Sequence, residues 1–195
     1  TPNCSSAASD VYKRQDPAVR AAALLALARH GGPEDAPLFQ TALNSTHRVE
    51  RRAAAIFAQR VHMPELISFL AESANDAEED IQVRRDLTLA LSQYENDLAV
   101  DALVSALDAS RYAIVEAGRA GLRRLTGMDH GTDSALWQSA INASRREGQL
   151  FTRSKPYVFP VYDQDPGFFD QLAYWRPRPR EVSGPPIGFV LEPSP

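Results

Sequence analysis

The chain has 195 residues and a formal net charge of −4 at pH 7; 44% of its residues are hydrophobic and 24% are charged. These values are typical of a globular protein with a sizeable core. The acidic balance argues against a sequence-independent nucleic-acid binder, because such proteins are usually basic. No apolar run approaches the roughly 20 residues that a membrane span needs.

The first fifteen residues show no apolar periodicity, which is typical of a disordered N-terminal arm. Residues 5–15, SSAASDVYKRQ, also resemble the in-frame translation of an adapter used in transposase-based DNA sequencing libraries. This resemblance implies that residues 1–15 are a non-native leader and that native sequence starts at Asp16, with more of the natural protein upstream. Cys4 is the only cysteine of the chain, so we expect no disulfide or thiolate chemistry after residue 15.

Residues 16–125 contain four stretches with the same helical pattern. The first begins with Asp16, a good N-cap residue, and Pro17, which suits the first helical position; Gly31 and Gly32 end it. The predicted apolar faces are Val19, Ala23, Ala26 and Leu27; Val49, Ala53, Ile56 and Phe57; Val83, Leu87, Ala90 and Leu91; and Ile114, Gly118, Gly121 and Leu122. Shorter amphipathic helices are expected between them, at residues 34–43, 63–72 and 97–107.

Repetition at about 30 residues, with two helices per unit, predicts an all-α fold, a right-handed α-solenoid. One helix pair has too little apolar surface to be stable alone, so the pairs must stack. Glycine inside a helix costs about 1 kcal/mol relative to alanine. We therefore expect Gly118 and Gly121 to serve close packing of neighbouring helices.

The phrase D-P-x-V-R-x-x-A-x-x-A-L at residues 16–27 resembles the second helix of a HEAT repeat, in the short bacterial form called PBS-lyase HEAT-like. The phrase VRRDLTLAL at residues 83–91 repeats it more loosely. The resemblance covers residues 16–125 and implies the fold far more specifically than the function. It also implies that the first repeat has only its second helix here, with the partner helix upstream of Asp16.

In HEAT repeats, an Asp before the second helix and an Arg after the Val often bond between neighbouring repeats. The resemblance assigns these positions to Asp16, Arg20, Asp80 and Arg84. Glu50 stands where Arg is usual, so we expect the ladder of bonds to be interrupted at that repeat.

A final helix is predicted after Asp133, which suits its N-cap, with Leu136, Trp137, Ala140 and Ile141 on its apolar face. The preceding L-T-G-x-D phrase resembles one that closes bacterial HEAT arrays. We therefore expect the α-solenoid with its capping helix to occupy residues 16–148.

Residues 149–195 differ sharply in composition, because nine of the 14 prolines lie in the last 45 residues. Proline breaks helices, so we expect an extended, aromatic-rich tail laid across the end of the solenoid or along a groove. One short helix is expected at residues 167–175. The Arg-Pro run at residues 176–180 is predicted to be extended, either solvated or a polyproline-type ligand for a partner.

The candidate binding residues are arginines of the predicted second helices and two aromatic residues of the tail. HEAT arrays line their concave face with second helices, so the resemblance implies a basic inner stripe for an acidic partner or a phosphate backbone. The alternative, which we favour, is that these arginines are solvated or paired with Glu50, Asp86 and Glu116. The candidates are Arg51, Arg52, Arg84, Arg85, Arg119, Arg123, Tyr174 and Trp175; Arg124 lies beside them.

No candidate catalytic, cofactor-binding or metal site is assigned. HEAT-type di-iron hydroxylases carry His-Glu dipeptides, and none of the four histidines is followed by Glu. Asp129, His130 and Asp133 lie close together, but capping and turn formation explain the two aspartates without acid–base chemistry.

The sequence therefore favours a non-catalytic protein-interaction scaffold or adaptor, with another protein or peptide as its partner. One alternative is nucleic-acid binding through the arginines, like that of HEAT-like DNA glycosylases. Another is a lyase-like or accessory role on a tetrapyrrole, implied only by the family name. A catalytic domain upstream of Asp16 would make the chain a module of an enzyme.

Overall fold

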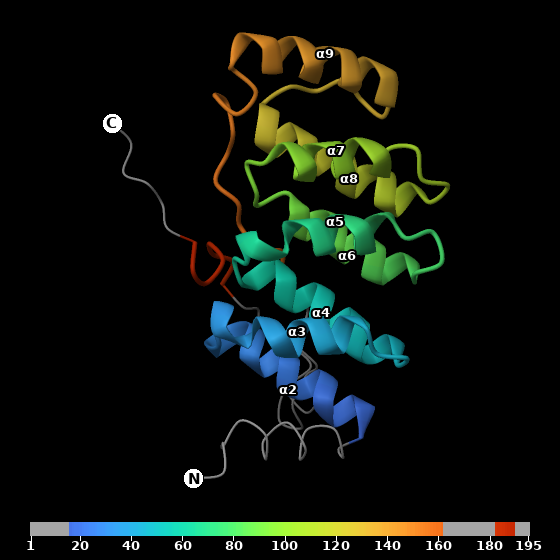
Figure 1. Cartoon of the computed structure of the whole chain (residues 1–195), viewed down its shortest axis with the longest axis vertical. Helices are drawn as coiled ribbons and strands as arrows, with labels where there is room; N and C mark the ends of the chain where they lie inside the picture. Colours follow the sequence, from blue (N-terminus) through green and yellow to red (C-terminus); the bar gives the residue numbers. More distant parts are fainter. Residues whose placement is uncertain (1–15, 162–181, 190–195) are drawn as a thin grey trace, which may run out of the picture.

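The computed structural model describes residues 16–161 and 182–189 (Figure 1). Within these ranges there is no β-strand, only an isolated parallel bridge between Val61 and Ile187. The predicted all-α fold is confirmed. The described elements are α2 (Pro17–His30), η1 (Pro33–Asp35), α3 (Ala36–Leu43), α4 (Arg48–Arg60), η2 (Pro64–Leu66), α5 (Ile67–Asn75), α6 (Ile81–Leu91), α7 (Asp97–Ala106), α8 (Tyr112–Thr126) and α9 (Ser134–Glu147).

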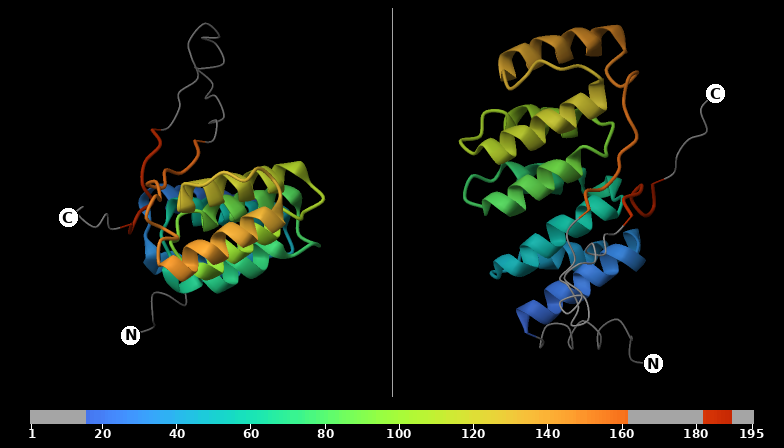
Figure 2. Two further views of the ribbon diagram at one scale, coloured as in Figure 1. Left: turned by 90° about the horizontal axis from the view of Figure 1, so that it is seen from above. Right: turned by 180° about the vertical axis from the view of Figure 1, so that it is seen from behind.

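The helices form two stacked layers (Figures 1 and 2). Helices α2, α4, α6 and α8 pack side by side in chain order and form the second-helix layer. Helices α3, α5 and α7 each pack against the long helix that follows them, and α9 packs on α7. This arrangement is consistent with an α-solenoid; its right-handedness stays a prediction.

The predicted apolar faces of α6 and α8 are confirmed, since all eight of their residues are buried. In α4 three of the four are buried, but Val49 is half exposed. The face predicted for α2 is wrong: Val19 and Ala26 are exposed, and Ala21, Leu24 and Ala28 are buried instead. Helix α2 has apolar residues on almost every side, so its periodicity could not select the face that meets α4.

The expected role of the two helical glycines is also confirmed. A Cβ atom on Gly118 would lie 2.8 Å from the carbonyl oxygen of Leu103 on α7. On Gly121 it would lie 2.8 Å from Cδ2 of Leu103 and 3.1 Å from Cβ of Ser92. Helices α7 and α8 are therefore as close as they are because α8 lacks these two side chains.

The predicted interruption of the inter-repeat ladder at Glu50 is wrong. Arg20 of α2 donates to both carboxylate oxygens of Glu50 on α4, from Nε at 3.0 Å and from Nη2 at 2.5 Å. The pair is nearly buried, and the hydrogen bond from Arg20 holds the pKa of Glu50 below its ordinary value. The residue that departs from the HEAT pattern is thus itself the acceptor of the arginine in the preceding repeat.

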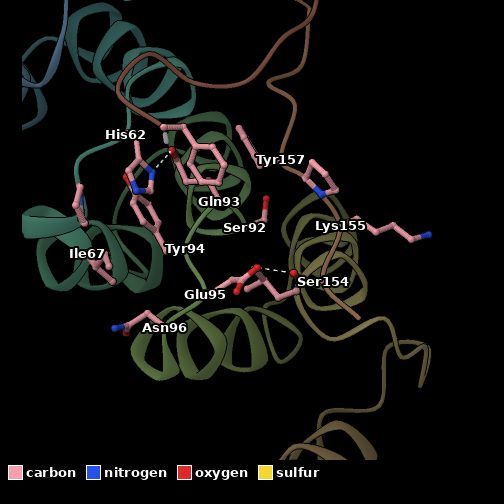
Figure 3. A pocket seen from close by; sticks show the side chains of 14 residues that line it. His62, Ile67, Ser92, Gln93, Tyr94, Glu95, Asn96, Ser154, Lys155 and Tyr157 are labelled. Atoms are coloured by element: carbon pink, nitrogen blue, oxygen red, sulfur yellow. Dashed lines mark hydrogen bonds between the residues drawn. The ribbon is translucent and has the colours of Figure 1, made fainter. Parts of the chain in front are cut away.

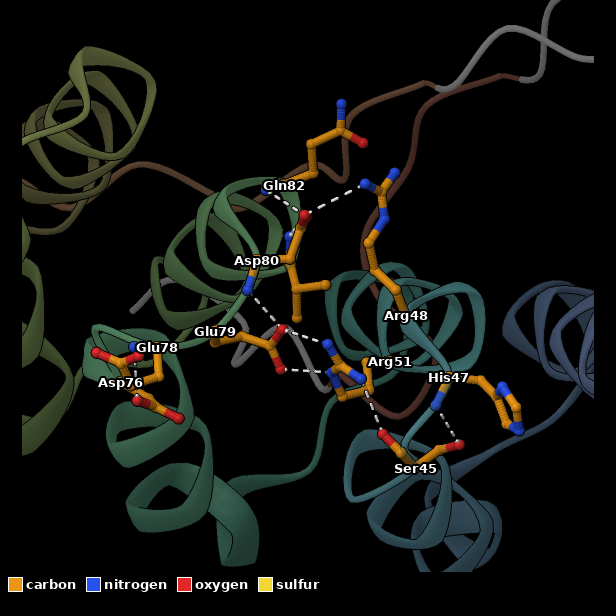
Figure 4. A network of polar contacts seen from close by, with 10 residues as sticks. Ser45, His47, Arg48, Arg51, Asp76, Glu78, Glu79, Asp80 and Gln82 are labelled. Carbon is orange, nitrogen blue, oxygen red and sulfur yellow. Dashed lines mark hydrogen bonds and ion pairs between the residues drawn. The ribbon is translucent and has the colours of Figure 1, made fainter.

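Two further ion pairs connect α4 with the start of α6 (Figure 4). Arg51 donates to Glu79 through Nε and Nη2, at 2.7 and 3.0 Å. Arg48 donates to Asp80 at 3.3 Å, while Asp80 also caps α6 by accepting from the backbone N–H of Gln82. The ladder therefore runs from α2 through α4 to α6.

The end of the array has the predicted capping helix, but the apolar face predicted for it is only partly right: Trp137 and Ile141 are buried, whereas Leu136 is 56% exposed. Asp133 accepts a hydrogen bond from the backbone N–H of Leu136 at 3.0 Å, as expected of an N-cap residue. Trp137 is fully buried and its Nε1 donates to the carbonyl oxygen of Gly131. Gly127 ends α8 in the left-handed region at φ 68°, where a side chain would also strike Arg153.

The described parts of the tail run back along one edge of the array (Figure 2). Lys155 donates its backbone N–H to the carbonyl oxygen of Arg124, at the end of α8. Ile187 donates to the carbonyl oxygen of Arg60 and accepts from the N–H of His62, at the end of α4. The short helix expected at residues 167–175 and the run at 176–180 lie outside the described residues, and the domain division at residue 148 stays a prediction.

Candidate protein-interaction surface

Two of the six candidate arginines are engaged inside the array. Arg51 binds Glu79 as described above and also donates to the backbone carbonyl of Ser45 at 2.9 Å. The hydrogen bond that Arg51 donates to Glu79 raises the pKa of Arg51 above its ordinary value. Arg84 donates from Nε to the carbonyl oxygen of Ala74, at the end of α5. These two side chains therefore connect helices, and any contact of theirs with a partner stays a prediction.

The other four arginines, Arg52, Arg85, Arg119 and Arg123, keep part of their side chains exposed on α4, α6 and α8, and we call this surface the arginine face. The side chains of Arg52, Arg85 and Arg123 are 42%, 46% and 55% exposed. Arg119 lies one turn before Arg123 on the same side of α8. The face thus extends across three neighbouring helices of one layer.

These four arginines share few carboxylates. Asp86 is almost fully buried and lies 3.3 Å from Nη1 of Arg85 and 3.9 Å from Nε of Arg52. Asp129 lies 3.0 Å from Nη2 of Arg119 and 3.2 Å from Nε of Arg123. The predicted pairing of the arginines with Asp86 is confirmed, whereas Glu50 pairs with Arg20 instead.

Glu116 adds one weaker partner, 3.5 Å from Nη1 of Arg119, as the sequence predicted. The hydrogen bond from Arg119 holds the pKa of Asp129 below its ordinary value, so this carboxylate is ionised at neutral pH. Among the described residues, four guanidinium groups therefore face three carboxylates, one of which is buried. Counted over residues 16–161 and 182–189, the arginine face keeps a positive surplus on a chain whose net charge is −4.

A hollow of about 300 Å³ lies at the end of α8, next to the arginine face. Arg123, Arg124 and Lys155 line it with Asp129 as the only carboxylate among its described lining residues. Arg124 is fixed there, because Nη1 donates to the carbonyl oxygen of Pro156 and its guanidinium lies 5.0 Å over the ring of Tyr157. Lys155 has no ion-pair partner in the part of the chain that the structure describes.

Sequence reasoning missed Lys155 as a candidate and assigned Asp129 only to a turn. The position of Lys155 depends on the backbone hydrogen bond that brings the tail back to α8. No sequence pattern near Lys155 predicts that bond. The spacing of ten residues between Arg119 and Asp129 does not predict their contact either, because the two side chains meet only where the turn after α8 folds back.

His130, which the sequence places close to Asp129 and Asp133, packs against a residue of the capping helix. Its ring lies edge-on to that of Trp137, with ring centroids 5.0 Å apart. Within residues 16–161 and 182–189, no three His, Cys, Asp or Glu side chains are placed to hold a metal ion. None of the described helices is long and apolar enough to cross a membrane. Tyr174 and Trp175 lie outside the described residues, so their role stays a prediction.

The family model for HEAT repeats matches residues 2–58. No curated protein and no solved structure matches the chain. The match and the layered helices confirm the resemblance to HEAT repeats, and the structure is consistent with a HEAT-repeat protein; the finer likeness to the PBS-lyase form stays a prediction. The match also covers residues 2–15, and this supports an interpretation of that stretch as part of a HEAT repeat. The interpretation of the same stretch as a translated adapter stays a prediction.

Proposed function

We propose that this chain is a non-catalytic HEAT-repeat scaffold that holds an acidic region of another protein on its arginine face. HEAT repeats commonly mediate protein interactions, and the match to their family supports the general class. The observation that carries the finer proposal is the charge of one surface. Four arginines lie across three neighbouring helices, and the part of the chain that the structure describes places too few exposed carboxylates beside them to neutralise them.

The frame beneath this surface is suited to binding by complementarity. Each helix of the second-helix layer packs against its neighbours, and the ion-pair ladder joins α2, α4 and α6. A stacked array of this kind holds side chains of successive repeats at fixed separations. A partner therefore meets a preformed row of charges and loses little free energy in ordering it.

The hollow at the end of α8 gives the partner's acidic side chains a place to enter. Arg124 is already immobilised by Pro156 and Tyr157, so its remaining donors are oriented before binding. Arginine presents paired donors that match a carboxylate in two places. Tyr174 and Trp175 are proposed as additional aromatic contacts, since such residues often act as anchors at interfaces.

The test is a charge reversal where the arginine face meets the hollow at the end of α8. Arg123→Glu should weaken binding of a synthetic peptide of alternating glutamate and leucine by about tenfold, measured by fluorescence anisotropy with the full chain. The matched control is Arg146→Glu, an exposed arginine on α9 away from the arginine face. Equal affinities of the two variants would contradict the proposal.

The same arginines keep nucleic-acid binding as a second candidate, which the same assay separates. A labelled DNA duplex should lose affinity steeply as salt rises if several phosphates are contacted. Binding of the acidic peptide without binding of the duplex at low salt would remove this candidate. Binding of the duplex alone would replace the protein partner with a nucleic acid.

A further inference from the structure

An open pocket of about 600 Å³ lies on the edge of the array, where the tail crosses it (Figure 3). Three segments give most of its lining, namely the turn after α4, the turn after α6 and the described parts of the tail, and Ile67 of α5 and Leu125 of α8 complete it. The tail is hydrogen-bonded to the last turn of α8 and, further on, to the last turn of α4. The pocket lies between these two attachments, at the end of α6.

Aromatic rings and prolines form one wall of this edge pocket. The His62 ring stacks on Tyr94 with centroids 4.9 Å apart, and Phe189 meets His62 edge-on at 5.0 Å. Pro64 and Pro156 also line the pocket. Flat apolar rings and pyrrolidine rings make up the kind of groove that takes proline-rich segments.

The floor of the pocket is held rigid by hydrogen bonds within the chain. Nε2 of Gln93 donates to the carbonyl oxygen of Ala58 at 2.7 Å, and its Oε1 lies 3.1 Å from Nδ1 of His62. The hydroxyl of Tyr94 accepts from the backbone N–H of Met63. These bonds fix the rings of the wall before any ligand arrives, which lowers the entropic cost of binding.

The rim of the pocket carries negative charge. Glu95 is exposed, accepts a hydrogen bond from the hydroxyl of Ser154, and forms no ion pair within residues 16–161 and 182–189. Glu65 adjoins the lining residue Pro64 in the sequence. The pKa of Tyr94 is raised, chiefly because its hydroxyl is buried, and the negative charge of Glu65 raises it further. Lys155 is the only lysine or arginine among the described lining residues, and its side chain points away from the cavity (Figure 3).

We propose that the edge pocket binds an extended, proline-rich segment of a partner protein that carries arginine. The rings of the wall would receive prolines, and Glu95 with Glu65 would receive the guanidinium groups. This inference goes beyond the acidic partner of the arginine face, because it concerns another surface and the opposite charge. The volume lies within the range of ordinary ligand pockets.

The probe is a labelled peptide with an Arg-Pro-Arg-Pro-Arg core, compared with a matched peptide that carries Gln at the three Arg positions. We expect the full chain to bind the arginine peptide more tightly by about tenfold. The double variant Glu65→Gln and Glu95→Gln should remove this preference, because Gln keeps the shape of the rim and the bond from Ser154 but not the charge. The matched control Glu147→Gln, at the exposed end of α9, should keep it.

A second variant tests the wall separately from the rim. Phe189→Ala should weaken both peptides alike, because it removes an aromatic surface and no charge. Circular dichroism of each variant checks that the helices are intact. Arg123→Glu should leave this binding unchanged, so failure here and failure of the arginine face can be told apart.

The chain itself contains an Arg-Pro run at residues 176–180, outside the described residues, and the test includes it. A third variant replaces Arg176, Arg178 and Arg180 with Gln in the full chain. If the arginine peptide bound this variant but not the unmodified chain, the pocket would be the site of the chain's own Arg-Pro run. The proposal that a partner protein binds there would then be overturned. Equal affinity for the two peptides, or no binding to any of these chains, would overturn the inference entirely.

Discussion

The array joins its helices in two different ways. Helices α7 and α8 pack closely because Gly118 and Gly121 have no side chains, which lets the backbone of α8 approach Leu103 on α7. Helices α2, α4 and α6 are joined in addition by ion pairs that begin at Arg20 and end at Asp80. A contact made by shape depends on single methyl groups, whereas a contact made by charge depends on pH and salt.

Breaking the glycine contact should have the largest effect. Gly118→Ala places a methyl group 2.8 Å from the carbonyl oxygen of Leu103, a backbone atom that cannot move aside alone. Overpacking against a backbone atom is expected at the upper end of the usual cost of about 1–3 kcal/mol, and a helix-propensity gain of about 1 kcal/mol offsets part of it, which leaves a net loss of about 2 kcal/mol. We expect a lower free energy of unfolding, measured by urea denaturation.

The matched control for this variant is on the same helix. Ala120 is exposed on α8, so Ala120→Gly should cost about 1 kcal/mol through propensity alone. If Gly118→Ala instead raised the stability, α7 would be able to shift, and the close approach would not be what fixes these two helices.

Breaking the ionic contact between α2 and α4 should cost somewhat less. Glu50→Gln leaves Arg20 without its carboxylate in a nearly buried place, where the side chains are 13% and 4% exposed for Arg20 and Glu50. Hydrogen bonds to charged groups contribute about 1.5–3 kcal/mol, and Gln keeps part of the contact. We expect a loss of about 1–2 kcal/mol in urea denaturation at pH 7.

The pH dependence of this loss sharpens the comparison. The pKa of Glu50 is lower in the folded chain than in the unfolded chain, because Arg20 stabilises the ionised form. Its contribution is therefore fully present above the ordinary carboxylate pKa and is lost as pH falls through the folded-state value. The difference between wild type and Glu50→Gln should shrink in acid, while the difference for Gly118→Ala stays constant. A constant difference for both variants would contradict the ionic origin.

The same contrast explains how much the sequence could predict. The buried faces of α6 and α8 follow from their periodicity, since polar residues mark the opposite sides. The HEAT pattern does not predict the bond between Arg20 and Glu50, because a carboxylate at a position where arginine is usual counts as a gap in that pattern. An acidic residue thirty positions after an arginine, at the same place in the repeat, is the signal that would have found it.

The candidate surface was predictable only in part. Arg52, Arg85, Arg119 and Arg123 follow from their place on the second helices. Sequence spacing did not separate them from Arg51 and Arg84, because only the packing shows which side of a helix meets a neighbour. The edge pocket was beyond prediction, since it depends on where the tail attaches.

The smallest effect is expected at the exposed end of the ladder. Arg48 donates to Asp80 at 3.3 Å from a side chain that is mostly in solvent. Exposed ion pairs contribute about 0–1 kcal/mol and are screened by salt. Arg48→Ala should therefore lower the free energy of unfolding by about 0.5 kcal/mol in low salt, as measured by urea denaturation, and by less in high salt. A loss as large as that of Glu50→Gln would mean that α4 and α6 depend on this pair, and that charge rather than apolar packing joins the repeats here.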